Sequence, residues 1–147
     1  MSSRRREQAA PDSERARVEE LRASAFAALD SAYAPYSEFR VGAALLGDDG
    51  SVAVGCNIEN ASYPACMCAE RVAVGTMVSR GVRRFAMLVL ATEAESPTPP
   101  CGFCRQVLAE FAPGLPIVSF TRSGHEARWT LADLLPTPFT PLLLNRA

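Results

Sequence analysis

The sequence is most informative through what it lacks. No lysine occurs among its 147 residues, and all fifteen basic side chains are arginines. Schiff-base catalysis and phosphate binding by a P-loop both need a lysine amine, so both are excluded. The single histidine, His125, offers little material for a histidine-based metal site or a Ser-His-Asp triad. The chemistry must therefore come from other side chains.

Strong net charge and long apolar runs are also missing. The formal net charge is −1, so no basic field indicates a nucleic acid or an acidic membrane surface as partner. No apolar run approaches the ~20 residues that span a bilayer. Because no apolar segment follows the arginines at positions 4–6, we expect no secretory signal. Five cysteines without an export signal favour the reducing cytoplasm and indicate metal or thiol chemistry rather than disulfides.

The hydrophobic pattern predicts one domain of α/β class over residues 13–147, preceded by a disordered tail over residues 1–12. Ser13 is predicted to be the N-cap of the first helix, which runs to about Ala32. Later helices are expected at residues 68–79, 102–111 and 131–135. Five strands are expected at residues 41–46, 52–58, 85–91, 117–120 and 128–130. This order predicts a three-layer αβα sandwich with helices on both faces of a mixed five-stranded sheet.

The cysteines form the main chemical motif. Cys101 and Cys104 make a C-x-x-C at the start of one predicted helix, and Cys68 opens another. A helix N-terminus stabilises a thiolate through its partial positive charge and free N–H groups, and the thiolate is the form that binds zinc. Structural zinc sites almost always have four protein ligands, whereas catalytic sites leave one position for water. Three cysteines at two helix starts therefore favour a catalytic zinc ion.

Other readings of the same residues stay open at this point. Cys66, Cys56 or His125 are candidates for a fourth ligand of a structural site, although Cys66 lies only two residues before Cys68. Cys56 falls in a predicted strand, where a free cysteine is usually a small hydrophobic residue. Glu70 lies two residues after Cys68, and this offset keeps its carboxylate near the metal as a proton carrier. A surface glutamate in a first helical turn is the alternative.

Two arginines are candidates for compensating the negative charge of the site. Three thiolates around Zn²⁺ give a net charge near −1, which weakens the acidification of a bound water. Arg71 and Arg105 directly follow Glu70 and Cys104, and either is expected to donate a hydrogen bond to a thiolate sulfur. The alternative for each is an exposed helical arginine.

These motifs together resemble the zinc-dependent cytidine deaminases, in particular the small homotetrameric type. The resemblance covers the chain from about Val18 to Phe139, and several separate motifs occur in the right order. The matching stretches are Pro35-Tyr36-Ser37-Glu38-Phe39, Val41-Gly42-Ala43, Gly55-Cys56-Asn57-Ile58-Glu59-Asn60-Ala61, Cys68-Ala69-Glu70-Arg71, Pro100-Cys101-Gly102-Phe103-Cys104-Arg105-Gln106 and Leu134-Leu135-Pro136 before Phe139.

The resemblance implies an αβα fold of the cytidine deaminase type and one zinc ion per subunit. It implies that Asn57 and Glu59 hydrogen-bond the ribose and that Phe39 packs against the pyrimidine. It further implies that Ala69 offers its backbone N–H to the base. Tyr63 and Phe139 would complete neighbouring pockets of a homotetramer. By pattern alone, Asn57 and Glu59 are a polar pair on one strand face, and Phe39 is a core aromatic.

The implied reaction is the hydrolytic deamination of cytidine and 2′-deoxycytidine, as in pyrimidine salvage. Zinc activates water, Glu70 moves the protons, and ammonia leaves without any organic cofactor. One alternative is a deaminase of a cytosine-nucleoside antibiotic of the blasticidin S type, which shares the zinc site and differs at the sugar end. A non-catalytic module stabilised by zinc is an alternative of another class. Deamination of polynucleotides is disfavoured by the slightly acidic charge.

Overall fold

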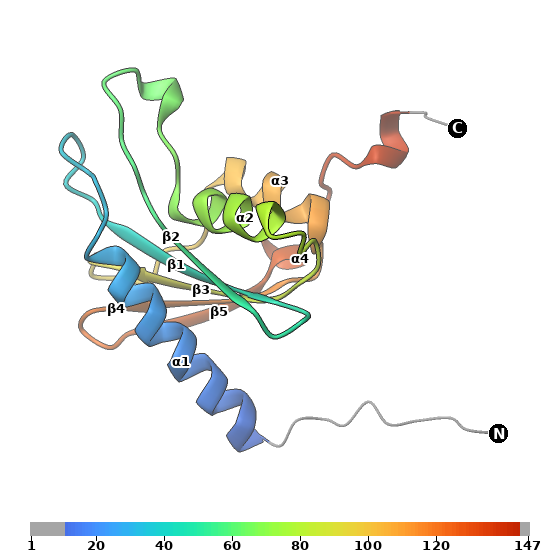
Figure 1. The fold of residues 1–147 in the computed structure, drawn as a ribbon, viewed down its shortest axis with the longest axis horizontal. Coiled ribbons are helices and arrows are strands. Elements are labelled where there is room, and N and C mark those ends of the chain that lie inside the picture. Colours follow the sequence, from blue (N-terminus) through green and yellow to red (C-terminus); the bar gives the residue numbers. More distant parts are fainter. Residues whose placement is uncertain (1–10, 145–147) are drawn as a thin grey trace.

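The computed structural model describes residues 11–144, and a mixed five-stranded sheet with helices on both faces forms its centre (Figure 1). The sheet has the strand order β2-β1-β3-β4-β5. The strands are β1 (Val41–Gly47), β2 (Val52–Cys56), β3 (Phe85–Thr92), β4 (Pro116–Thr121) and β5 (Glu126–Thr130). The helices are α1 (Pro11–Leu29), α2 (Ala69–Ser79), α3 (Gly102–Phe111) and α4 (Leu131–Leu134), and single 3₁₀ turns are η1 (Tyr63–Ala65) and η2 (Pro141–Leu144). The predicted αβα architecture is confirmed.

The pairing of the strands places the site-bearing helices at one end of the sheet. β1 pairs antiparallel with both β2 and β3, whereas β3 and β4 are parallel. α3 connects the parallel pair, and α2 connects β2 to β3. The apolar run of β3 is buried on both faces of the sheet, as expected for a central strand. In an α/β sheet of this kind, ligands bind outside the carboxyl ends of the parallel strands.

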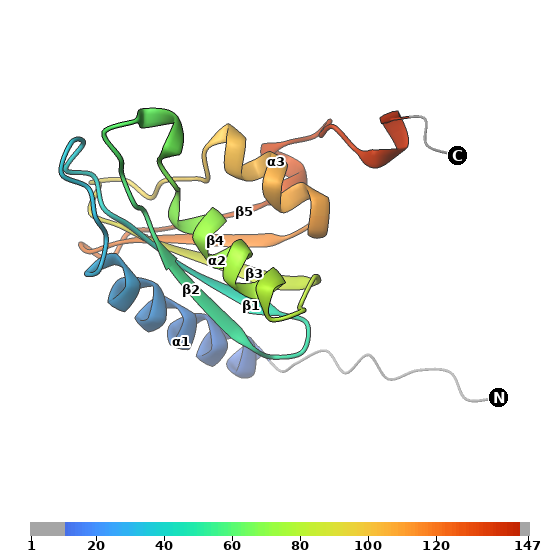
Figure 2. The same cartoon turned by 45° about the horizontal axis from the view of Figure 1, so that its top comes forward.

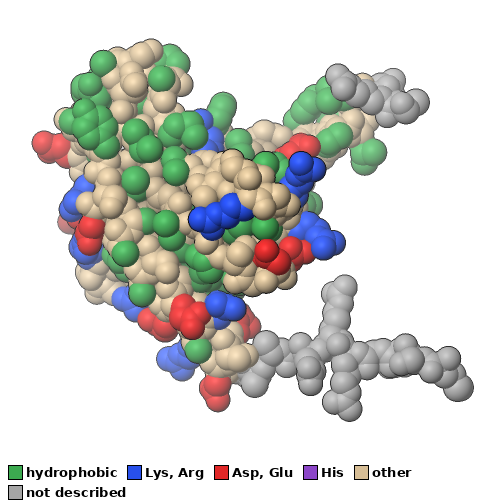
Figure 3. Space-filling view, viewed as in Figure 1, with side chains coloured by type: hydrophobic (Ala, Val, Ile, Leu, Met, Phe, Trp, Pro, Cys, Tyr) green, Lys and Arg blue, Asp and Glu red, His purple; other side chains and the backbone are tan. Residues whose placement is uncertain are grey.

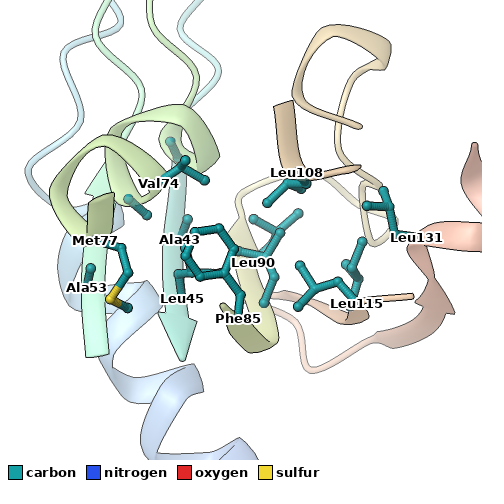
Figure 4. Close-up of a cluster of buried hydrophobic side chains, with 14 residues drawn as sticks. Ala43, Leu45, Ala53, Val74, Met77, Phe85, Leu90, Leu108, Leu115 and Leu131 are labelled. Carbon is teal, nitrogen blue, oxygen red and sulfur yellow. The ribbon is translucent and has the colours of Figure 1, made fainter. Parts of the chain in front are cut away.

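Two hydrophobic cores lie on opposite faces of the sheet, because neighbouring residues of a strand point to opposite sides. The turned view shows α1 alone on one face and α2 and α3 on the other (Figure 2). Leu45 and Leu90 face α2 and α3, where they pack with Met77 and Leu108 (Figure 4). The other core lies between the sheet and α1 and includes Val18, Leu21, Leu29, Ala44, Val89 and Val118.

Two glycines allow helices to approach the sheet backbone closely. A Cβ at Gly42 would lie 2.6 Å from the backbone nitrogen of Leu29 in α1. A Cβ at Gly55 would lie 2.7 Å from the backbone nitrogen of Ala73 in α2. These distances are shorter than ordinary van der Waals contact, so both positions need a residue without a side chain. Gly55 thereby sets the depth at which the first turn of α2 sits.

The differences from the predicted elements are concentrated at their ends. α1 begins at Pro11 and includes the predicted N-cap Ser13, since proline is well suited to a first helical position. Residues 1–10 of the predicted tail lie outside the described residues. β2 ends at Cys56, because Ile58 forms separate bridges to Tyr33 and Met67. The 3₁₀ turn η2 lies in a proline-rich segment for which no element was predicted.

Exposed hydrophobic side chains gather over two parts of the surface. One part is the loop between β2 and α2 with the turn that precedes β1, where Tyr63 is 70% exposed (Figure 3). The other is the C-terminal turn η2, in which Leu142 is 90% exposed. Within residues 11–144, no helix combines the length and the apolar character that crossing a membrane requires.

Candidate active site

The starts of α2 and α3 bring three cysteines together. Cys68 is the N-cap residue of α2, Cys101 is the N-cap residue of α3, and Cys104 lies in the first turn of α3. Neither cap cysteine uses its side chain to cap its helix. Both thiols are therefore available to a ligand, beside first-turn N–H groups that lack intrahelical acceptors.

The sulfur geometry fits a zinc ion. The Sγ atoms of Cys68, Cys101 and Cys104 all lie within 4.8 Å of one another, and those of Cys68 and Cys101 are 3.9 Å apart. Tetrahedral zinc with Zn–S bonds of about 2.3 Å separates its sulfur ligands by about 3.8 Å. The three cysteines thus hold their sulfurs at nearly the separation that zinc requires, and a fourth coordination position stays open.

The residues considered as fourth ligands are not part of this group. In the part of the chain that the structure describes, the group contains only the three cysteines. The Cys66 sulfur accepts a hydrogen bond from the Asn60 N–H at 3.3 Å, and His125 Nδ1 lies 3.0 Å from the Glu95 carbonyl oxygen. The arrangement therefore matches a catalytic zinc site rather than a closed structural one.

The thiols of the group differ in their acidity. The pKa of Cys68 is lowered to about 5, first by the hydrogen bond from the Cys104 thiol and then by the Arg71 guanidinium. The pKa of Cys104 is raised by the same hydrogen bond, by burial and by nearby negative charge. Cys68 therefore carries negative charge more readily than Cys104, and it sits where a cation is favoured.

Arg71 is held against the cysteine group by several contacts. Its Nη2 donates to the carbonyl oxygen of Cys66 at 2.9 Å and lies 3.9 Å from the Cys68 sulfur. The guanidinium also lies over the ring of Phe103, 4.6 Å from its centroid. This placement suits the predicted donation to a thiolate sulfur.

Arg105 contacts different partners from those predicted. Its Nε donates to the Pro100 carbonyl oxygen at 2.8 Å, and its Nη1 donates to the Leu134 carbonyl oxygen at 2.9 Å. These bonds join the loop before α3 to the end of α4. The expectation that Arg105 donates to a cysteine sulfur is corrected accordingly, because its guanidinium is turned to backbone oxygens.

Glu70 is buried at the second position of α2, with 5% of its surface exposed. Burial raises the pKa of Glu70 to about 7, and the negative charge at Cys68 acts in the same direction. A carboxyl group that titrates near neutral pH can both accept and donate a proton. The alternative of a solvated surface glutamate does not fit this burial.

Glu70 lines a cavity of about 180 Å³ in front of the cysteine group. The cavity brings together six of the residues selected from the sequence: Phe39, Asn57, Cys68, Ala69, Glu70 and Cys101. Sequence reasoning missed its remaining lining residues, which are Val41, Leu90, Thr92, Thr98 and Pro99. Several of these lie at strand ends, and the rule that ligands bind at the carboxyl end of parallel strands could have pointed to Leu90 and Thr92.

Asn57 and Glu59 are both bonded to the segment before β1. The Asn57 side chain accepts from the Val41 N–H at 2.8 Å and donates to the Phe39 carbonyl oxygen at 2.7 Å. The Glu59 carboxylate accepts from the Tyr36 N–H at 2.9 Å and from the Ser37 hydroxyl. The two side chains thus fix the loop that carries Phe39.

Glu59, Tyr63 and Phe139 lie outside the cavity that this chain forms. Glu59 and Tyr63 line a separate open depression with Tyr36, Ser37 and Cys66. Phe139 has 56% of its surface exposed, and its backbone N–H and carbonyl both bond to the side chain of Gln106. A single protomer therefore does not bring these three residues to Glu70.

The α/β sandwich holds three cysteines placed for an open zinc site, with a buried carboxyl beside them. This combination defines a zinc-dependent hydrolase of the deaminase type. The family model described as "Cytidine and deoxycytidylate deaminase zinc-binding region" matches residues 16–119. The chain belongs to this family.

Individual relatives agree with this assignment. A cytidine deaminase of Sporosarcina psychrophila is 48% identical over 124 residues, which cover 84% of this chain and 91% of the relative. The crystal structure of cytidine deaminase from Burkholderia pseudomallei superimposes with a TM-score of 0.79 at 45% identity, covering 82% of this chain and 98% of that chain. The structure of cytidine deaminase from Mycobacterium tuberculosis gives a TM-score of 0.71 at 43% identity, covering 82% and 95%.

Proposed function

We propose that this protein catalyses the hydrolytic deamination of cytidine and 2′-deoxycytidine, in the cytoplasm and as part of pyrimidine salvage. The observation that carries the proposal is the buried Glu70 carboxyl beside an open three-cysteine metal group in one cavity. The names of the relatives support the choice of a cytosine nucleoside as substrate. The absence of lysine excludes the competing route through a Schiff base.

Cys68, Cys101 and Cys104 would hold the zinc ion. When bound, zinc supplies Lewis-acid chemistry that makes water nucleophilic near neutral pH. Arg71 offsets part of the thiolate charge by lying 3.9 Å from the Cys68 sulfur. This compensation favours the acidification of water, which three uncompensated thiolates would oppose.

Glu70 would carry the protons of the reaction. Its carboxylate takes a proton from the attacking water and delivers it to N3 of the cytosine, while a C–O bond forms at C4. Glu70 then takes the remaining proton from the new C4 hydroxyl and passes it to the amino group. As the C4–N bond breaks, the C4 carbonyl of the uridine product forms and ammonia leaves. The pKa of Glu70, raised to about 7 by burial, suits a group that must both accept and donate protons.

The remaining cavity residues would bind the base. Ala69 is the first residue of α2, and the helix has no side-chain cap, so its backbone N–H is suited to an oxygen of the pyrimidine. Phe39 is 39% exposed and lines the cavity, where its ring would pack against the base. Asn57, which lines the cavity, and Glu59, which lies outside the cavity of one protomer, would bind the ribose while they hold the loop of Phe39 in place.

The protein would act as a homotetramer. The cavity of about 180 Å³ is smaller than the ~300–1,000 Å³ of ordinary ligand pockets. Tyr63 and Phe139 are large aromatic residues exposed on the protomer, as expected for side chains that another subunit covers. In an assembly they would complete neighbouring sites and enclose the sugar end of the substrate.

The first experiment follows the ultraviolet absorbance of cytidine and 2′-deoxycytidine with the zinc-loaded protein, with ammonia assayed in parallel. Both substrates should be converted with one ammonia per nucleoside. Conversion only of a sugar-modified cytosine nucleoside would favour an antibiotic deaminase instead.

The variant Glu70→Gln tests the mechanism. It should keep its zinc and its fold but lose turnover by about 10²–10⁴-fold, since the amide cannot carry protons. Glu110→Gln, an exposed position on α3, is the matched control and should retain wild-type activity. If the Glu70 variant kept most of its activity, a non-catalytic role of the buried carboxyl would be favoured.

A further inference from the structure

Thr92 places a buried hydroxyl at the floor of the cavity. It is the last residue of β3, where it pairs with Val41 of β1 and Thr121 of β4. Leu90, two positions earlier, faces α2 and α3, so the side chain of Thr92 points to the same side. Thr92 is 0% exposed and lines the cavity in front of Glu70.

The Thr92 hydroxyl has no hydrogen-bond partner among residues 11–144. Buried hydroxyls elsewhere in the same strand layer are satisfied. Thr121 Oγ1 accepts from the His125 N–H at 3.0 Å, and Ser119 Oγ accepts from the Thr98 N–H at 3.1 Å. A buried polar group without a partner is destabilising, and such groups are rare in folded proteins. Thr92 is thus an exception among these buried hydroxyls, and it belongs to a residue that lines the cavity.

The other polar side chains of the cavity have partners within the protein or roles in the chemistry. Thr98 Oγ1 donates to the Ser96 carbonyl oxygen at 3.4 Å. Both ends of the Asn57 amide are bonded to the backbone of Phe39 and Val41. Glu70 and the cysteines are reserved for the metal and the protons. The Thr92 hydroxyl is therefore a neutral group that can both donate and accept, and that gains a partner when the cavity is filled.

We infer that Thr92 is a substrate-binding residue whose Oγ1 hydrogen-bonds the bound cytosine nucleoside. This inference rests on the proposed function and adds a contact that fixes the nucleoside against β3. A site built to hydrogen-bond its ligand loses affinity when the hydroxyl is removed, because the ligand's polar atom is then buried without a partner.

The experiment compares zinc-loaded Thr92→Val and Thr92→Ser with the wild type. Valine keeps the branched shape and removes only the hydroxyl, so kcat/KM for cytidine should fall about tenfold, mainly through KM. The ligand-free valine variant should melt no lower than the wild type, since it removes an unsatisfied group. Serine keeps the hydroxyl and should restore KM to within about threefold of the wild type.

Thr121→Val is the matched control, because its hydroxyl is buried and has partners within the protein. It should lower the melting temperature and leave KM unchanged. An unchanged KM in Thr92→Val, with a wild type that turns over cytidine, would overturn the role of Thr92 alone. A melting temperature lowered as much as in Thr121→Val would overturn it too, because the hydroxyl would then have a partner without substrate. A wild type that leaves cytidine unchanged would instead refute the proposed function.

Discussion

Replacing Gly55 by alanine should lower activity by pushing α2, which carries Glu70, away from the sheet. The new Cβ would lie 2.7 Å from the Ala73 backbone nitrogen and 3.0 Å from Val72 Cβ, and closer still to the Ala69 carbonyl oxygen. Carbon atoms prefer separations of about 3.5–4.0 Å, so α2 would have to move away from β2 by about 1 Å. All the nearest atoms belong to one helix turn, which carries Glu70 immediately beside Ala69.

The cost of this shift has two parts. Overpacking typically destabilises a protein by about 1–3 kcal/mol, which corresponds to a melting temperature lower by roughly 3–9 °C for a chain of this size. A misplacement of about 1 Å at a reacting group costs about 10²-fold in rate. We therefore expect the folded, zinc-loaded Gly55→Ala protein to lose turnover by about 10²-fold.

Gly42→Ala provides the control for general instability. Its Cβ would lie 2.6 Å from the backbone nitrogen and 2.9 Å from the Cβ of Leu29, in α1 on the opposite face of the sheet. It should lower the melting temperature by a similar amount, yet keep turnover per zinc-loaded molecule near that of the wild type. Thermal unfolding, zinc content and cytidine turnover measure these effects. Wild-type turnover in Gly55→Ala, or an equal loss of turnover in both variants, would refute the reasoning.

Three further predictions concern the metal group, the charged surface and the last helix. After removal of zinc by a chelator, iodoacetamide should modify Cys68 faster than Cys104, because Cys104 is buried and its pKa is raised. Peptide mass spectrometry would measure the two rates, and bound zinc should protect both cysteines. The pKa of Glu93 is lowered first by the hydrogen bond from Arg40 and then by Arg122. Its contribution to folding stability is therefore present at neutral pH and disappears as the pH falls through its folded-state pKa. The difference in melting temperature between the wild type and Glu93→Gln should therefore narrow as the pH falls below the ordinary glutamate pKa of about 4.3, and a constant difference would contradict this. Thr130→Ala removes the capping box of α4 and should cost about 1 kcal/mol in chemical unfolding, whereas Thr137→Ala, at an exposed position between α4 and η2, should cost less.

The elements of the fold were predictable because the signals that define them are local. The apolar run of β3 and the turn at residues 47–50 each follow from a few neighbouring residues, and α3 spans the predicted residues 102–111. The start of α1 was predicted three residues late, since an N-cap at Ser13 makes Glu14 the first helical residue instead of Pro11. Proline and serine both occur at helix starts, and the sequence does not rank them.

The site was predictable only where its chemistry is carried by motifs. Cys68, Cys101 and Cys104 converge as expected. Cys68 and Cys101 are the N-cap residues of two helices that start at the same end of the sheet, and Cys104 lies in the first turn of the second helix. Thr92 was missed because no motif marks it; only its place at the carboxyl end of a strand that pairs in parallel could have pointed to it. The partners of Arg105 were also beyond the sequence, since the Leu134 carbonyl oxygen reaches it only through the tertiary fold.

The division of the core by the sheet has a consequence for how this protein can be altered. The core under α1 contains none of the residues that line the cavity or hold the metal. Substitutions in this core can change the free energy of unfolding without altering the cavity or the metal ligands, which lie on the other face of the sheet. Substitutions intended to raise the stability of this protein to heat or solvent should therefore be tried first in the core under α1. The same core should also tolerate conservative substitutions with the least effect on activity.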